Sequence, residues 1–328
     1  MTLILPLGVA PSPVPLLTAA TVARPDRGTR RAELVRVMRG VYAPAQAWRE
    51  LAPWERYVAR VHAASIVHPD AVFILESAAA LLGLPIFGEP QHVHVLLPEP
   101  ASSRAFSGVQ IHTRERMPAL ELRDGLRVAT ACETVVEMAR LRHPAVALAL
   151  AGMALRADPA LAHADLRRTS AAIPTSRGAK RAKWVFDRAS GVPESTLEHV
   201  SLAAIEWLGF DAPTLQHWVR GAGAGDDDRL DFCWEYERIG GEADGDVKYS
   251  GDYGDAREAL AARNARDARL LRRGVTAMAH WGWRDVRAPQ QLRALLTAAG
   301  LRPVRPEEPG HLHTLAAALT SSRLPRLR

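Results

Sequence analysis

The chain has 328 residues, of which 48% are apolar and 24% are charged. This length suits two domains, and the apolar content excludes a wholly disordered chain. Two cysteines, Cys132 and Cys233, exclude a disulfide framework and an all-cysteine zinc site. The net charge of +6 is unevenly distributed: residues 1–190 carry +8, residues 191–250 carry −9 and residues 251–328 carry +7. The basic parts weakly favour a polyanionic partner.

The chain contains no convincing targeting or membrane segment. Residues 1–23 carry no charged side chain, but four prolines interrupt any helix there and no basic residue precedes the apolar stretch. The later apolar runs are too short to span a bilayer. We therefore expect a cytoplasmic protein with no membrane partner.

The first predicted element with a possible function is a hairpin within residues 29–43. The strand LVRVM leads through an Arg-Gly turn into VYA, a pattern typical of the wing of a winged helix. Such a wing would offer Arg36 and Arg39 to DNA phosphates. A surface hairpin with solvated arginines explains the same pattern equally well.

Helices and strands alternate through the next hundred residues. Apolar spacing predicts a helix over 54–67, and a second helix over 71–83. One face of the first helix carries Trp54, Val58, Val61 and Ala64 or Ser65. Strands are predicted at 92–98 and 108–114. His92 and His94 share one face of the first of these strands, and we favour an exposed face over a metal site.

Two helices and a basic segment complete the first half of the chain. A short strand at 126–128 precedes predicted helices over 131–141 and about 144–156. Residues 171–190 carry several cations around a probable short helix. This segment is interpreted as a basic connector between domains, with a solvated face more common than a nucleic-acid contact.

The acidic segment combines a helix with a predicted sheet. A helix over 194–208 is followed by a strand at 214–219 and an acidic turn at 221–228. In the next strand, the apolar residues Leu230, Phe232 and Trp234 alternate with polar positions that include Asp231. A turn at 235–238 leads to a further strand, which carries Glu242 and Asp244. Asp231, Glu242 and Asp244 are therefore expected to meet, with Glu198 added from the helix.

Clustered carboxylates repel one another unless a cation neutralises them. Oxygen ligands suit Mg²⁺ or Mn²⁺, and Asp231 and Glu242 are the predicted metal ligands. A metal there could activate water against a phosphate, with Lys248 orienting that water or stabilising the developing charge. The alternative is a pair of exposed strand ends with solvated acids.

A basic helix over 255–273 follows, and a strand over 275–281 closes the segment. Arg263 and Arg266 on this helix are candidates to contact phosphates beside the carboxylates. The helix could equally be a solvated cover for the sheet.

Several motifs resemble known families. PESTLE (193–198), RLDFCW (229–234), GEADGDVKY (241–249) and RNARDARLLRRG (263–274) resemble the very-short-patch-repair-type endonuclease domain of the PD-(D/E)xK superfamily. MRGVYA (38–43), SAAALLGLP (77–85) and ACETVVEMARL (131–141) are similar to AbiEi-like antitoxin proteins.

The nuclease resemblance implies a metal-dependent phosphodiesterase ancestry and assigns roles to single residues. By this resemblance Glu198 is the helix acid, Asp231 the principal metal ligand and Glu242 the second ligand. Asp244 stands where the superfamily's broad pattern places a lysine. Lys248 could substitute for that lysine only if its side chain reaches back.

The expected fold is α/β in two parts. Residues 1–170 form a mixed α+β region with a partial winged helix, 171–190 the basic connector, 191–300 a restriction-endonuclease-like mixed sheet flanked by helices, and 301–328 a C-terminal tail. The expected function is a metal-dependent DNA endonuclease. The alternatives are an antitoxin-like DNA-binding transcriptional regulator with an inactive nuclease-like domain, and a scaffold protein. DNA is the expected partner, a cognate toxin is possible, and the sequence does not specify an oligomeric state.

Overall fold

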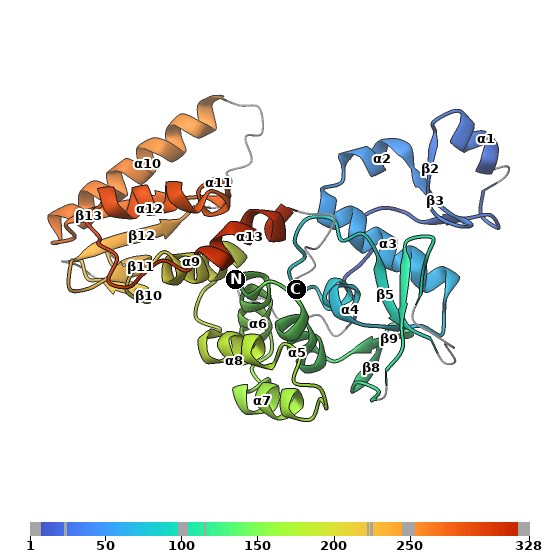
Figure 1. The fold of residues 1–328 in the computed structure, drawn as a ribbon. Helices are drawn as coiled ribbons and strands as arrows, with labels where there is room; N and C mark the ends of the chain where they lie inside the picture. Colours follow the sequence, from blue (N-terminus) through green and yellow to red (C-terminus); the bar gives the residue numbers. More distant parts are fainter. Residues whose placement is uncertain are drawn as a thin grey trace. The chain divides into compact units, whose positions relative to one another are not determined.

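The computed structural model describes residues 8–22, 25–97, 104–114, 116–221, 223, 226–244 and 253–320. It is a mixed α/β protein that divides into two compact units. Unit 1 comprises Met1–Ala189 with Ala317–Arg328, and unit 2 comprises Ser190–Ala316 (Figure 1). The boundary therefore lies at the end of the segment interpreted as a connector.

Unit 1 begins with a small sheet around the predicted hairpin. Its strands are β1 (Leu17–Thr18), β2 (Leu34–Met38) and β3 (Val41–Pro44), in the order β1-β3-β2. Helices α1 (Pro25–Arg30), α2 (Ala45–Glu50) and α3 (Pro53–Val67) accompany them. Gly40 has a φ of 78°, which suits the tight turn between β2 and β3. Arg36 and Arg39 are both exposed on this hairpin.

A second sheet forms the centre of unit 1, with its described strands in the order β6-β7-β5-β4-β9-β8. These strands are β4 (Val72–Phe73), β5 (Val93–Leu96), β6 (Arg104–Phe106), β7 (Val109–His112), β8 (Leu120–Arg123) and β9 (Leu126–Ala129). The prediction of one helix over 71–83 was wrong at its start, because Val72–Phe73 pairs with two strands and helix α4 spans only Leu75–Leu81.

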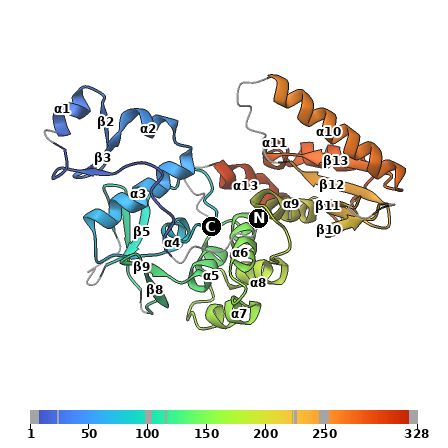
Figure 2. The same ribbon diagram turned by 180° about the vertical axis from the view of Figure 1, so that it is seen from behind.

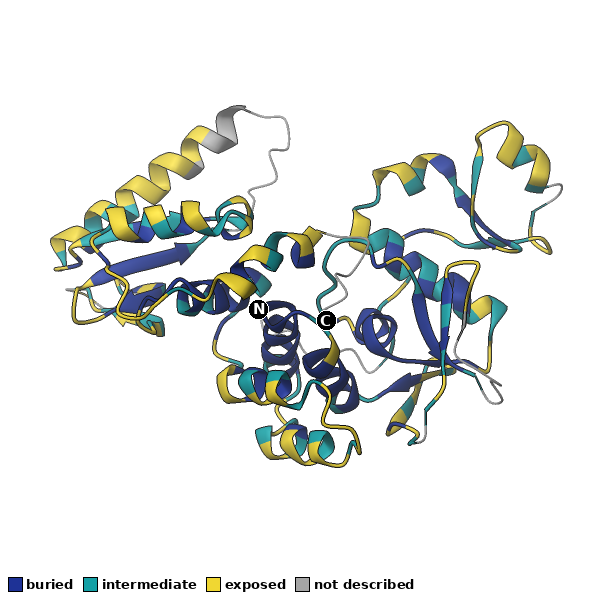
Figure 3. Cartoon of the chain, in the orientation of Figure 1, coloured by how far each residue is buried: buried dark blue, intermediate teal, exposed yellow. Residues whose placement is uncertain are grey.

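Helices account for the rest of unit 1: α5 (Ala131–Leu141), α6 (Pro144–Ala157), α7 (His163–Ala171) and α8 (Ala179–Arg188). Helix α6 is apolar around most of its circumference and is almost wholly buried (Figure 3). Helix α8 lies within the segment interpreted as a connector, and it buries Ala182, Val185 and Phe186 in unit 1. Lys180, Lys183 and Arg188 are exposed, whereas Arg181 Nη1 donates a hydrogen bond of 2.8 Å to Arg140 O on α5.

Two further sequence expectations in unit 1 were wrong. Trp54 is 51% exposed at the start of α3, although Val61 and Ala64 of the same predicted face are buried, together with Tyr57. His94 is buried rather than exposed, because both faces of β5 are covered. A strand at the centre of a covered sheet buries polar and apolar positions alike.

Unit 2 is built around a sheet in the order β10-β11-β12-β13. Strands β10 (Thr214–Val219), β11 (Asp228–Trp234) and β12 (Ile239–Ala243) are antiparallel neighbours, and β13 (Ala277–Trp281) runs parallel to β12. Helix α9 (Thr196–Trp207) precedes the sheet, and α10 (Tyr253–Arg272) connects β12 to β13. In both views α10 lies above this sheet and α9 below it (Figures 1 and 2).

Aromatic packing fixes the sheet of unit 2 against α9. The rings of Phe232 and Trp281 lie 5.1 Å apart, and Trp281 Nε1 donates a hydrogen bond of 2.8 Å to Ser201 Oγ on α9. A Cβ atom added at Gly241 would stand 2.7 Å from the Trp281 ring, so glycine is required for this close approach.

Three further helices complete the described part of unit 2: α11 (Trp283–Arg287), α12 (Pro289–Ala298) and α13 (Pro309–Thr320), the last of which extends past the unit boundary. The segment expected to be a tail packs here. Val304 N and Arg305 N both donate to Gly209 O, and the His311 ring stacks on Trp207 at 4.8 Å. Residues 301–316 therefore belong to the second unit.

No helix in the described ranges combines the length and apolar character needed to cross a membrane.

Candidate functional site

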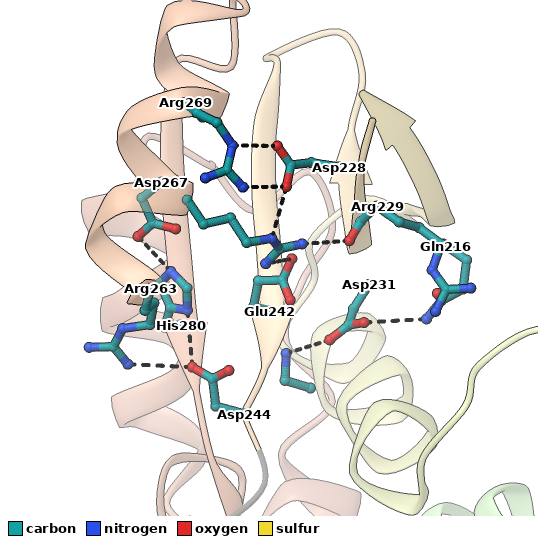
Figure 4. Close-up of polar contacts among 12 residues, drawn as sticks. Gln216, Asp228, Arg229, Asp231, Glu242, Asp244, Arg263, Asp267, Arg269 and His280 are labelled. Carbon is teal, nitrogen blue, oxygen red and sulfur yellow. Dashed lines mark hydrogen bonds and ion pairs between the residues drawn. The ribbon is translucent and has the colours of Figure 1, made fainter. Parts of the chain in front are cut away.

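The predicted acids lie where β11 and β12 run side by side. Phe232 pairs with Gly241 in the antiparallel register, which places Asp231 opposite Glu242. Asp231 Oδ2 accepts a hydrogen bond of 3.0 Å from Ala243 N (Figure 4). The alternation of apolar and acidic residues in β11 thus places one carboxylate from each strand at the same point of the sheet.

Gln216 connects this pair to the helix acid. Its Nε2 donates to Glu198 Oε2 at 2.8 Å and to Asp231 Oδ1 at 3.3 Å. Gln216 has a φ of 51°, an uncommon conformation for a residue with a side chain. Local backbone strain of this kind is concentrated at functional sites. Its Oε1 is buried without a hydrogen-bond partner among the described residues.

The start of α9 holds Glu198 in a buried position. Ser195 caps the helix, and its Oγ accepts from Glu198 N at 3.1 Å. Glu198 Oε2 also accepts from Glu194 N at 3.0 Å. The Glu198 carboxylate is therefore fixed by a backbone donor and by the side chain of Gln216.

Burial and mutual repulsion perturb both central carboxyls. Burial, with the nearby charge of Glu198, raises the pKa of Asp231 to about 6. Burial, with the charge of Asp231, raises the pKa of Glu242 to about 7 even though Arg266 acts in the opposite direction. Two ionised carboxylates at this place are unfavourable unless a cation is added.

The donor set fits a divalent cation held by two carboxylates. Mg²⁺ commonly keeps several waters and is bound through one or two carboxylates, and Asp231 and Glu242 supply two. Glu242 Oε1 is buried and lies 3.0 Å from Arg266 Nη1, so a cation would have to displace this guanidinium. The described residues contain no group of three or more His, Cys, Asp or Glu side chains placed to hold a metal. Water would have to complete the coordination.

Asp244 does not join the central pair but faces α10. Its Oδ2 lies 3.0 Å from His280 Nδ1 and 3.4 Å from Arg263 Nη1 (Figure 4). His280 Nε2 in turn lies 2.9 Å from Asp267 Oδ2. The hydrogen bond between the two residues raises the pKa of His280 and lowers the pKa of Asp244. The position expected to carry lysine therefore holds an acid paired with an imidazole whose other nitrogen faces a second carboxylate.

A cluster around Asp228 was missed by sequence analysis. Asp228 is buried, and its carboxylate lies 2.9 Å from Arg269 Nη2, 2.8 Å from Arg273 Nη1 and 3.4 Å from Arg266 Nε. Asp228 was assigned to the acidic turn, but it is the first residue of β11. The available signal was the spacing of Arg266, Arg269 and Arg273 by three and four residues on the helix predicted over 255–273.

The predicted phosphate-binding arginines lie in different places. Arg263 and Arg266 both contact acids of the site, the latter through an ion pair of 3.0 Å between Arg266 Nη1 and Glu242 Oε1. Arg36 and Arg39 lie on the hairpin of unit 1. Lys248 lies outside the described residues.

We expect the raised pKa of Glu242 to make stability depend on pH. A carboxyl whose pKa is higher in the folded state than its usual 4.5 favours folding while protonated, and this contribution is lost as pH rises to about 7. Glu242→Gln cannot titrate. In metal-free unfolding experiments, the variant should therefore gain stability relative to the wild type between about pH 5 and pH 8. The exposed Glu237→Gln is the control, and an equal pH trend in all three proteins would contradict this expectation.

Comparisons with known proteins return no match: no family model, no curated protein and no solved structure is similar to this chain.

Proposed function

We propose that unit 2 is a metal-dependent DNA endonuclease of the PD-(D/E)xK type. The observation that carries this proposal is the opposition of Asp231 and Glu242 across β11 and β12, with Glu198 linked to them through Gln216. Both carboxyl groups have a raised pKa, which favours the binding of a cation to their ionised forms.

The order of elements in unit 2 supports the same proposal. One helix precedes three antiparallel strands, and a second helix leads to a strand parallel to the third. This arrangement is consistent with a restriction-endonuclease-like fold, and it brings acids from α9, β11 and β12 to one place. Fold alone does not establish an activity, so the proposal depends on the site.

In the proposed reaction, the chain's own residues hold and orient the reactants. A divalent cation would supply a nucleophilic water and stabilise charge on the phosphate. Asp231 and Glu242 would hold that cation, and Glu198 and Gln216 would position Asp231. His280, whose pKa is raised by its hydrogen bond with Asp244 and by Asp267, would when protonated place positive charge near Glu242 without the usual lysine. Arg263 and Arg266 would contact phosphates.

The direct test is a plasmid-nicking assay with Mg²⁺ or Mn²⁺. The wild type should nick DNA only with the metal, and Asp231→Ala should abolish nicking, while the exposed Glu237→Ala should leave it unchanged. Metal-dependent nicking that survives in Asp231→Ala would locate the activity elsewhere. No nicking by the folded wild type with either metal would reject the proposed activity.

An antitoxin-like DNA-binding regulator with an inactive nuclease-like domain remains the second candidate. The observation that favours it is the ion pair between Glu242 and Arg266, which already neutralises one proposed ligand. The exposed Arg36 and Arg39 would then contact DNA from a partial winged helix, in the cytoplasm and with a possible toxin partner. Arg36→Ala combined with Arg39→Ala should weaken DNA binding, and the loss should shrink at high salt because phosphate contacts release counterions.

A further inference from the structure

Arg266 occupies a position between the candidate metal ligands and a second buried acid. Its Nη1 lies 3.0 Å from Glu242 Oε1, its Nε lies 3.4 Å from Asp228 Oδ1, and its Nη2 donates to Arg229 O at 2.6 Å. All three contacts come from one guanidinium on α10. Arg266 therefore acts as the counter-ion of Glu242 in the absence of a metal.

The two acids depend on Arg266 to very different degrees. Asp228 keeps Arg269 and Arg273 at 2.9 and 2.8 Å if Arg266 leaves. Among the described residues, Glu242 forms an ion pair with Arg266 alone. If Arg266 moved away, Arg269 and Arg273 would still neutralise Asp228. The carboxylate of Glu242 would lose its counter-ion and would be repelled by the carboxylate of Asp231.

The Arg266 side chain is partly exposed at the surface of α10, which is where an outside anion would reach it. The Arg266 side chain is 29% exposed, whereas that of Glu242 is 11% exposed. Arg263 lies about one helical turn before Arg266 on α10. Its side chain is also partly exposed, and it forms an ion pair with Asp244. A phosphate diester offers a guanidinium the same pair of charged oxygens as a carboxylate, so it can replace Glu242 as the partner of Arg266.

We propose that Arg266 is an exchangeable counter-ion: it neutralises Glu242 in the free protein and moves to a nucleic-acid phosphate on binding, which frees Asp231 and Glu242 for a divalent cation. This inference rests on the proposed function and adds its regulation. Metal binding is then tied to the presence of substrate, and the free protein holds the cation weakly.

The exchange predicts positive coupling between the two ligands. DNA should increase Mn²⁺ affinity, and Mn²⁺ should increase DNA affinity by the same factor, because linkage is reciprocal. Coupling between two sites typically amounts to roughly 5–150-fold in affinity, and the charge change at Glu242 places the expected effect in this range.

Calorimetric titration of Mn²⁺ into the full-length protein, with and without a short DNA duplex, tests the exchange. The duplex is checked on a gel afterwards. At about pH 8.5, above the raised pKa of Glu242, DNA should tighten Mn²⁺ binding by at least about fivefold in the wild type. In Arg266→Gln, Mn²⁺ should bind the free protein more tightly than it binds the free wild type, and DNA should add nothing.

Two further variants on α10 separate exchange from loss of charge. Arg269→Gln removes a neighbouring arginine whose ion pair, within the described residues, is with Asp228 and not with Glu242, so it should preserve the coupling. Arg266→Lys keeps a charge that can neutralise Glu242 and should retain part of the coupling. Circular dichroism confirms that each variant is folded.

The outcomes distinguish this inference from the proposed function. Mn²⁺ binding that DNA does not change in the wild type, or equal coupling in the wild type and Arg266→Gln, would overturn the exchange and leave the nuclease proposal standing. Absence of Mn²⁺ binding by the folded wild type, both with and without DNA, would overturn the proposed function itself.

Discussion

Asp231→Asn is expected to abolish detectable Mn²⁺ binding in calorimetry. Asparagine keeps the shape of the side chain but removes its charge, so the substitution tests electrostatics rather than packing. One remaining carboxylate, Glu242, rarely holds Mg²⁺ or Mn²⁺ tightly with water alone. The loss should appear with and without DNA, because no exchange of Arg266 restores the missing ligand.

The fold should tolerate this substitution. An asparagine Oδ1 can still accept the hydrogen bond that Ala243 N donates to Asp231. The raised pKa of Asp231 shows that its charged form is disfavoured in the folded protein, so a neutral side chain costs little there. We expect the unfolding midpoint of the metal-free variant near pH 7 to match or exceed that of the wild type.

The control and the contradicting outcome are specific. Glu237→Gln removes a charge from the exposed turn between β11 and β12 and should bind Mn²⁺ like the wild type. If Asp231→Asn binds as tightly as the wild type, the metal lies elsewhere. If the folded wild type binds no metal with or without DNA, the DNA-binding regulator becomes the better interpretation.

Local sequence patterns predicted the sheet of unit 2 closely. The predicted strand at 214–219 coincides with β10, because its flanking turn residues mark both ends. The alternation around Phe232 predicted β11, and the turn at 235–238 predicted its antiparallel partner β12. These three strands are consecutive in the chain, so their pairing requires only short-range information.

Contacts between segments far apart in the sequence could not be predicted from local sequence patterns. Nothing in the sequence around Asp228 shows that arginines some forty residues later neutralise it. The partner of Asp244 is His280 on the parallel strand β13, reached only after a crossover helix. The burial of His94 likewise depends on strands and helices that cover β5 from elsewhere in unit 1.

The buried His94 is part of a cluster of charged and titratable residues in unit 1. Arg142 binds Glu76 through two nitrogens, one of them Nη2 at 2.7 Å from Oε2. His94 Nε2 lies 3.6 Å from Glu76, and His94 Nδ1 lies 2.9 Å from His112 Nε2. Burial lowers the pKa of both histidines to about 4, so they are neutral near pH 7 and Arg142 is the cation that balances Glu76.

Glu76→Gln should therefore destabilise the protein strongly. Burial acts to raise the pKa of Glu76, but Arg142 outweighs it and lowers the pKa to about 2. Removal of the carboxylate charge leaves the guanidinium of Arg142 buried without a counter-ion, which typically costs about 3–5 kcal/mol. Denaturant unfolding near pH 7 measures this loss for the transition of unit 1.

A matched exposed pair separates burial from charge in this test. Asp70 is 72% exposed and pairs with Arg127 at 3.3 Å in the same unit, so Asp70→Asn should cost under about 1 kcal/mol. Glu76→Leu combined with Arg142→Met removes both buried charges and should recover much of the stability lost in Glu76→Gln. Equal losses for Glu76→Gln and Asp70→Asn would show that the buried pair does not hold unit 1 together. A double variant no more stable than Glu76→Gln would assign the loss to packing rather than to the unpaired charge.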